Sequence, residues 1–204
     1  MKSISVDGGA LAYAENGSGN AVVLIHGFLL DHSTWDSVTP RLASRARVLR
    51  PDLRGLGRSS VTPGPYLIEL LAADIAALLD AKDIATATLV GHSLGGGVAM
   101  QFSYQFPEMT ERLVLMSSGG LGRELHAILR MAALPGAEVV LPWLCSSRLR
   151  GLVEGSAKLL GRAGVRAGTD VREVWRGVGT LFDADTRRAF LQTMRTVVDV
   201  GGQR

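Results

Sequence analysis

Apolar residues recur with two different spacings along the first 118 residues. Short apolar or alternating runs, which are typical of β-strands, cover residues 3–6, 10–15, 21–25, 46–50, 86–90 and 112–117. Longer segments, in which apolar residues return every three or four positions, predict helices over residues 32–42, 67–79 and 95–105. The turn residues Asp7-Gly8-Gly9 predict a hairpin between the first two strands. Because strands alternate with helices, we expect an α/β fold with a mostly parallel sheet.

The pattern changes after residue 120. Residues 121–200 are amphipathic with helical spacing, and they are interrupted by proline and glycine, for example at Pro135-Gly136 and Pro142. No strand-like run stands out in this segment. We therefore predict a core that covers residues 1–120 and a helical cap region that covers residues 121–204.

Composition is that of a globular protein. Hydrophobic residues make up 47% and charged residues 20% of the 204 positions, which suits one domain with its own core. The net charge of +3 comes from scattered arginines, without the basic run or stripe that marks a nucleic-acid-binding surface. The sequence therefore gives no reason to expect a nucleic-acid partner.

Cysteine usage and hydropathy indicate a cytoplasmic protein without a membrane span. Cys145 is the single cysteine, so we expect neither an intramolecular disulfide nor a thiolate metal site. The first residues lack the apolar run of a signal peptide. The longest apolar stretch, residues 125–145, is interrupted by charged residues and prolines, which argues against a span.

The strongest chemical signal is Gly91-His92-Ser93-Leu94-Gly95, which joins the fifth predicted strand to the third predicted helix. A Gly-x-Ser-x-Gly segment in this setting is typical of a nucleophile elbow, where a strained serine stands clear of the sheet. The two glycines supply the small residues that such a turn requires, and the helix N-terminus favours developing negative charge. We predict Ser93 as a nucleophile. The alternative is a glycine-rich turn with a helix-capping serine.

A second motif, His26-Gly27-Phe28, follows the buried strand at residues 21–25. Acyl transfer requires two N–H donors around the oxyanion. One normally belongs to the residue after the nucleophile, here Leu94, and the other to the loop after the third strand, here Phe28. We interpret His26 as a structural residue whose hydrogen bonds fix this loop, rather than as the catalytic base.

A third motif, Asp52-Leu53-Arg54-Gly55-Leu56-Gly57-Arg58-Ser59, follows the fourth strand. Its glycines and its Asp/Arg pair predict a tight polar loop beside the elbow. We expect Asp52 and Arg54 to support this loop through charge-assisted hydrogen bonds rather than to react. A phosphate-binding loop is the rival interpretation, but the lysine of a P-loop is missing and the spacing differs.

In this order, the three motifs resemble the α/β-hydrolase superfamily, and within it the bacterial esterase, lipase and haloperoxidase-like branch with a helical cap. The resemblance covers residues 1–120 through the motifs and residues 121–200 more loosely as the cap. It implies a Ser–Asp/Glu–His triad, an oxyanion hole of backbone amides, and neither a cofactor nor a metal.

The chain departs from the family's pattern after the nucleophile. In the family the acid and the histidine follow the serine, whereas the one histidine after Ser93 is His126, at the start of the predicted cap. His92 adjoins the serine and should point away from it, and His32 is at best a rim residue. The acidic residues near the end of the chain fall in predicted cap helices: Asp183, Asp185 and Asp199.

These departures predict a C-terminally truncated hydrolase in which the last strands of the sheet, the triad acid and the histidine are missing. The strand at residues 112–117 should then be an exposed sheet edge. A serine without a general base is a weak nucleophile, so we expect impaired activity.

Three functions remain open on the sequence. The first is hydrolysis of carboxylic esters by Ser93. The predicted cap is apolar, which suggests a small apolar ester as the substrate. The apolar cap residues are Leu134, Val139, Val140, Leu141, Trp143 and Leu144. The second is a non-catalytic fragment or pseudoenzyme that keeps the fold to bind a ligand or partner. The third is another reaction at the same serine, either cofactor-free haloperoxidase chemistry or carbon–carbon bond hydrolysis. Epoxide hydrolases and haloalkane dehalogenases fit less well, because those branches use an aspartate nucleophile.

Overall fold

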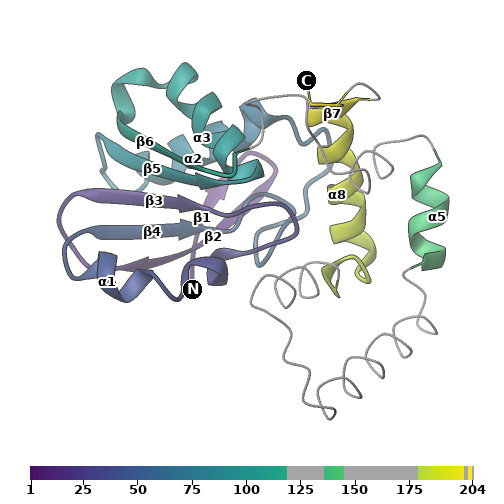
Figure 1. Cartoon of the computed structure of the whole chain (residues 1–204), viewed down its shortest axis with the longest axis horizontal. Coiled ribbons are helices and arrows are strands. Elements are labelled where there is room, and N and C mark those ends of the chain that lie inside the picture. The colour runs from purple at the N-terminus through teal and green to yellow at the C-terminus, as the bar shows by residue number, and fades with distance from the viewer. Residues whose placement is uncertain (119–135, 145–178, 200–201, 204) are drawn as a thin grey trace, which may run out of the picture.

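The computed structural model of the chain describes residues 1–118, 136–144, 179–199 and 202–203. Its centre is a six-stranded sheet with the strand order β1-β2-β4-β3-β5-β6 (Figure 1). The strands are β1 (Lys2–Val6), β2 (Gly9–Asn16), β3 (Ala21–Ile25), β4 (Arg47–Pro51), β5 (Ala87–His92) and β6 (Thr110–Met116). β4, β3, β5 and β6 run parallel, so the expected mostly parallel sheet is confirmed.

The first two strands form the predicted hairpin. β1 and β2 are antiparallel, and Val6 pairs with Gly9 across the turn. Gly8 adopts φ 77°, which a residue without a β-carbon tolerates at little cost. β2 then pairs antiparallel with β4, and the hairpin thereby extends the parallel sheet on one side.

Helices cover both faces of the sheet. α2 (Ile68–Asp80) and α3 (Leu94–Gln105) pack against one face, where Val23 and Ile25 of β3 join the main hydrophobic core. η1 (His32–Trp35) and α1 (Thr39–Ala43) lie on the other face, where Leu24 packs with Trp35. Successive side chains of a strand point to opposite faces, so the unbroken apolar run of β3 serves both layers.

The sequence predicts one continuous helix over residues 32–42, and this prediction is wrong. The structure has two short pieces there, η1 and α1, and Pro40 lies in the first turn of the second piece. Proline lacks an N–H and would break a continuous helix at this position, whereas it is well tolerated in a helix's first turn. The apolar spacing of the segment is correct, but the proline decides how the backbone divides.

The described part of the predicted cap consists of α5 (Ala137–Leu144), α8 (Ala184–Val197) and a two-residue strand pair, β7 (Val198–Asp199) with β8 (Gly202–Gln203). This strand pair was not predicted, and it places Asp199 in a strand rather than in a helix. His126 and Cys145 lie outside the described residues. The division into a core and a cap region at residue 120 stays a prediction.

α8 lies beyond the carboxyl ends of the parallel strands, and α5 lies farther out (Figure 1). Their described apolar side chains form a cluster separate from the main core, against which Phe28, Leu29 and Leu141 also pack; its buried members are Ala137, Leu181, Phe190, Leu191 and Met194. Val139, one of the apolar residues of the predicted cap, is 73% exposed.

β6 forms one edge of the sheet, as predicted. Among the described residues it pairs only with β5, and three of its apolar side chains are exposed: Leu113, Val114 and Met116. No helix within the described ranges has the length and apolar character needed to cross a membrane.

Candidate active site

Ser93 occupies a sharp corner between β5 and α3. β5 ends at His92, α3 begins at Leu94, and Ser93 between them adopts φ 53° and ψ −118°. A positive φ is uncommon for a residue with a β-carbon and stores backbone strain. The Ser93 N–H donates to the carbonyl of Met116 on β6 over 3.1 Å, which helps to hold the corner. The corner has the form that the Gly-x-Ser-x-Gly segment predicts for an elbow.

The glycines around Ser93 are required by close backbone contacts. A β-carbon on Gly91 would lie 2.3 Å from the carbonyl oxygen of Gly95. One on Gly95 would lie 2.3 Å from the carbonyl oxygen of Ile25. Both distances are far below van der Waals contact, so each glycine lets the corner form against its neighbours. This is the steric role predicted for the two motif glycines.

The segment that follows β3 lies directly against the corner. We call residues 27–30 the Gly27 loop. A β-carbon on Gly27 would lie 3.1 Å from the Ser93 β-carbon and 3.0 Å from Nδ1 of His92. The register explains this contact, because β3 and β5 are neighbours and Ile25 pairs with Gly91. The sheet therefore brings together the segments that carry all three predicted site residues, Ser93, Phe28 and Leu94.

The Gly27 loop has its own backbone constraints. The Leu30 N–H donates to the Gly27 carbonyl over 3.3 Å, and Leu29 adopts φ 57°. The Phe28 ring points to the cap side, where it meets the Phe190 ring edge-on with centroids 4.8 Å apart. A role of the Phe28 and Leu94 N–H groups as oxyanion donors stays a prediction.

His26 is a structural residue, as predicted. Its side chain is fully buried, its Nδ1 lies 2.8 Å from the Gly27 carbonyl, and its Nε2 lies 2.9 Å from the Leu53 nitrogen. Because the Leu53 N–H is a donor, Nε2 accepts and Nδ1 carries the proton. Burial lowers the pKa of His26, which favours this neutral form. The ring therefore ties the Gly27 loop to the loop after β4.

Asp52 and Arg54 support the loop after β4, but not as a pair with each other. Both Nε and Nη2 of Arg54 donate to the carboxylate of Asp74 on α2, over 2.8 and 2.6 Å, in a buried bidentate pair. The hydrogen bonds that Arg54 donates to Asp74 raise the pKa of Arg54. Asp52 instead accepts from the Arg58 N–H over 2.9 Å and from His32. Asp74 was not predicted as this partner, because it lies 20 residues from Arg54 on another element.

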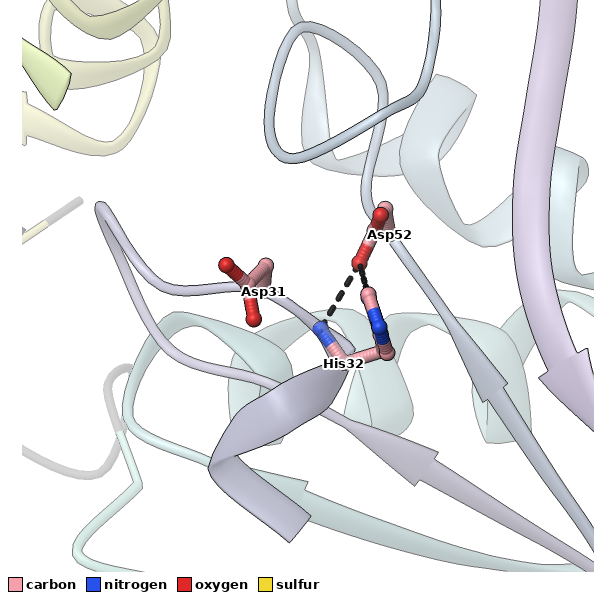
Figure 2. A group of neighbouring side chains, drawn as sticks. All are labelled: Asp31, His32 and Asp52. Carbon is pink, nitrogen blue, oxygen red and sulfur yellow. Dashed lines mark hydrogen bonds and ion pairs between the residues drawn. The ribbon is translucent and has the colours of Figure 1, made fainter. Parts of the chain in front are cut away.

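Asp31, His32 and Asp52 form the one group of potential metal ligands among the described residues (Figure 2). The Asp52 Oδ1 accepts from the His32 main-chain N–H over 2.7 Å and lies 2.8 Å from its Nδ1. The Asp31 Oδ1 accepts from the N–H and the hydroxyl of Ser33. These bonds cap η1 and join it to the loop after β4, so the grouping is explained by loop structure. A cavity of about 390 Å³ opens beside it, with Arg58, Thr180 and Thr186 among its lining residues.

The three motifs and the geometry of the elbow indicate a hydrolase fold, and comparisons with known proteins agree. A family model described as alpha/beta hydrolase fold matches residues 20–157, which is more than half of the chain. The chain belongs to the α/β-hydrolase fold family. Within this family, an uncharacterized protein of Mycobacterium tuberculosis is 38% identical over 201 residues, which are 98% of this chain and 59% of that relative.

Other members of the family match over shorter stretches or by structure. A 2-hydroxy-6-oxo-2,4-heptadienoate hydrolase of Pseudomonas putida is 38% identical over 113 residues, covering 53% of this chain and 41% of that enzyme. The crystal structure of a hydrolase from Pseudomonas aeruginosa superposes with a TM-score of 0.66 at 29% identity, covering 96% of this chain and 71% of that chain. An alpha/beta hydrolase fold protein from Burkholderia ambifaria superposes with a TM-score of 0.75 at 23% identity, covering 94% and 70% of the two chains, and shows the fold alone.

The chain is shorter than the proteins that it matches. This chain spans 59% of the length of the Mycobacterium tuberculosis relative and about 70% of the chains with similar structures. The matched part includes the elbow and the Gly27 loop. Triad members that follow the nucleophile in the family were not identified in this chain from its sequence.

Proposed function

We propose that Ser93 is the nucleophile of a serine hydrolase that cleaves carboxylic esters. The observation that carries this proposal is the strained backbone of Ser93 at the β5–α3 corner, with the Gly27 loop against it. Strain at a non-glycine residue persists where the surrounding structure over-determines it, and such residues cluster at active sites. In this reaction the Ser93 hydroxyl attacks the ester carbonyl, an acyl-enzyme forms as the alcohol leaves, and water releases the acid.

The main-chain N–H groups of Phe28 and Leu94 are proposed to bind the oxyanion. Both belong to segments that meet at Ser93, and within the described residues neither N–H donates to a protein acceptor. Leu94 is also the first residue of α3, where free N–H groups and the helix dipole favour negative charge. Two such donors together stabilise the tetrahedral intermediate.

The general base is proposed to be none of the three described histidines. His26 is buried with both ring nitrogens hydrogen-bonded, and the Nδ1 of His32 faces Asp52. His92 precedes Ser93, and its Nδ1 lies against Gly27. Loss of the histidine of a serine triad costs roughly 10⁶ in turnover. The sequence places the fourth histidine, His126, at the start of the predicted cap, where we do not expect a base, and we therefore expect this 204-residue chain to react slowly at Ser93.

The test is labelling by a fluorophosphonate, followed by intact mass spectrometry and peptide mapping. We expect slow modification at Ser93, barely above that of a Ser93→Ala variant. Ser103→Ala is the matched control, because Ser103 is a partly buried serine near the opposite end of α3 from Ser93. Its substitution should not affect labelling. Peptide mapping that finds the label only on residues other than Ser93 would contradict the nucleophile. Rapid, Ser93-dependent modification would instead show that the chain contains a base and would overturn the assignment above.

Carbon–carbon bond hydrolysis at the same serine is the second candidate. It is favoured by the similarity to the Pseudomonas putida hydrolase named for a 2-hydroxy-6-oxo-dienoate. Ser93 would again be required, so the two candidates differ in substrate rather than in site. Turnover of a 2-hydroxy-6-oxo-dienoate at a rate above that of a p-nitrophenyl ester, and lost in Ser93→Ala, would favour this second reaction.

A further inference from the structure

α8 is attached to the core at two places other than the Gly27 loop. A β-carbon on Gly55, in the loop after β4, would lie only 2.7 Å from the β-carbon of Ala189. The Thr196 hydroxyl donates to the Tyr66 carbonyl, just before α2, over 3.0 Å. Ala189 is 1% exposed, so this side of the helix is packed tightly against the core. In this arrangement α8 is a fixed part of the structure.

These attachments determine where Phe190 lies. Phe190 follows Ala189 in the helix, is 3% exposed, and presents its ring to Phe28 at an interplanar angle of 61°. Edge-to-face aromatic pairs of this kind stabilise a structure beyond the effect of burying their surface. The Phe190 ring is thus held by the helix on one side and touches the Gly27 loop on the other.

The Gly27 loop depends on such support. The Leu30-to-Gly27 hydrogen bond is long at 3.3 Å, and Leu29 is in a positive-φ conformation that costs backbone energy. The Phe28 N–H forms no hydrogen bond with the described residues, so the main chain alone holds this position weakly. Side-chain packing of Phe28 therefore has to keep its backbone in place.

We propose that α8 braces the oxyanion donor of this site and that Phe190 is a positioning residue, acting through the ring of Phe28. The catalytic meaning of the brace rests on the proposed function, because it assumes that the Phe28 N–H binds the oxyanion. The effect of α8 on the order of the Gly27 loop backbone does not depend on catalysis. It can therefore be measured without turnover.

The experiment is hydrogen exchange of single backbone amides in the 204-residue chain, measured by NMR. In Phe190→Leu, exchange of the Leu30 amide, which donates to the Gly27 carbonyl, should become about three- to tenfold faster relative to the amides of β3 in the same sample. Met194→Leu is the matched control, since Met194 is a buried member of the same cluster one helical turn farther along α8. It should leave that ratio within twofold of wild type.

Phe28→Leu removes the same ring contact from the other side and leaves α8 unchanged, so it replaces Phe190→Leu if that variant does not fold. The double variant should exchange no faster at Leu30 than the faster single variant, because both changes break one contact. Equal acceleration in Met194→Leu, or unchanged exchange in Phe190→Leu and Phe28→Leu, would overturn the proposal. Failure of Ser93 labelling would contradict the proposed function and leave the exchange result unaffected.

Discussion

At the scale of single residues, the site depends on backbone positions that only small side chains tolerate. Ser93 adopts a strained conformation, and Gly91 and Gly95 allow the chain to pass close to its neighbours on both sides. The energy stored in the corner is offset by the packing of β5 and α3, which hold it from two directions. A substitution at one of these glycines should therefore act on folding as well as on the nucleophile.

Gly95→Ala tests this argument. The added β-carbon would meet the Ile25 carbonyl oxygen at 2.3 Å and the His26 carbonyl oxygen at 2.5 Å, and these backbone atoms cannot move independently. We expect the free energy of unfolding to fall by about 1–3 kcal/mol or more. Gly179→Ala is the control, because nothing lies within 4 Å of its added carbon, and its effect should stay below about 0.5 kcal/mol. Urea unfolding followed by tryptophan fluorescence measures both, and equal midpoints for the two variants would refute the steric argument.

The sequence predicts residues whose role is carried by a local pattern and misses those whose role depends on a distant partner. Ser93 and the Gly27 loop follow from short motifs at strand ends. The Arg54–Asp74 pair and the His32–Asp52 contact each join residues 20 positions apart on different elements. No local spacing encodes such pairs. An arginine in a loop shows that it needs a partner, but not which carboxylate supplies it.

At the scale of elements, the exposed edge strand β6 has a clear consequence for association with other chains. It is the outer strand of the parallel part of the sheet, and the exposed fractions of Leu113, Val114 and Met116 are 38%, 44% and 47%. An edge that combines free backbone groups with exposed apolar side chains is a template for pairing with another chain. The exposed edge was predicted from the sequence, because the strands that follow in the family were not recognised after residue 120.

We expect the chain to self-associate through β6, and Val114→Lys to reduce this association by placing a charge on the edge. Val139→Lys is the matched control, since Val139 is 73% exposed and belongs to α5 rather than to the sheet. Sedimentation velocity over a concentration series gives the oligomer distribution of each variant. A distribution that responds equally to both substitutions, or to neither, would show that β6 is not the contact.

At the scale of the whole molecule, Glu15 joins parts of the chain that are distant in sequence. Its carboxylate on β2 lies 2.7 Å from Lys2 on β1, 2.8 Å from Arg47 on β4 and 3.5 Å from Lys82 after α2. Hydrogen bonds from Lys2 and Arg47 lower the pKa of Glu15 from 4.5 to about 2, against an opposing effect of burial. None of these contacts could be predicted from residue spacing, since they require the sheet order and the position of α2 to be known first.

The depressed pKa of Glu15 makes stability depend on pH in a defined window. The unfolded chain binds a proton at Glu15 near pH 4.5, while the folded chain does so only near pH 2. The stabilisation is therefore fully present above about pH 5 and is lost as the pH falls toward 2. Glu15→Gln should lower the free energy of unfolding by about 1 kcal/mol at neutral pH, with a smaller difference from wild type at pH 3. Urea unfolding from pH 3 to 7 measures this, with Glu69→Gln, at an exposed carboxylate on α2, as the control. A constant difference between wild type and Glu15→Gln across that range would show that the lost interactions do not involve the ionised carboxylate.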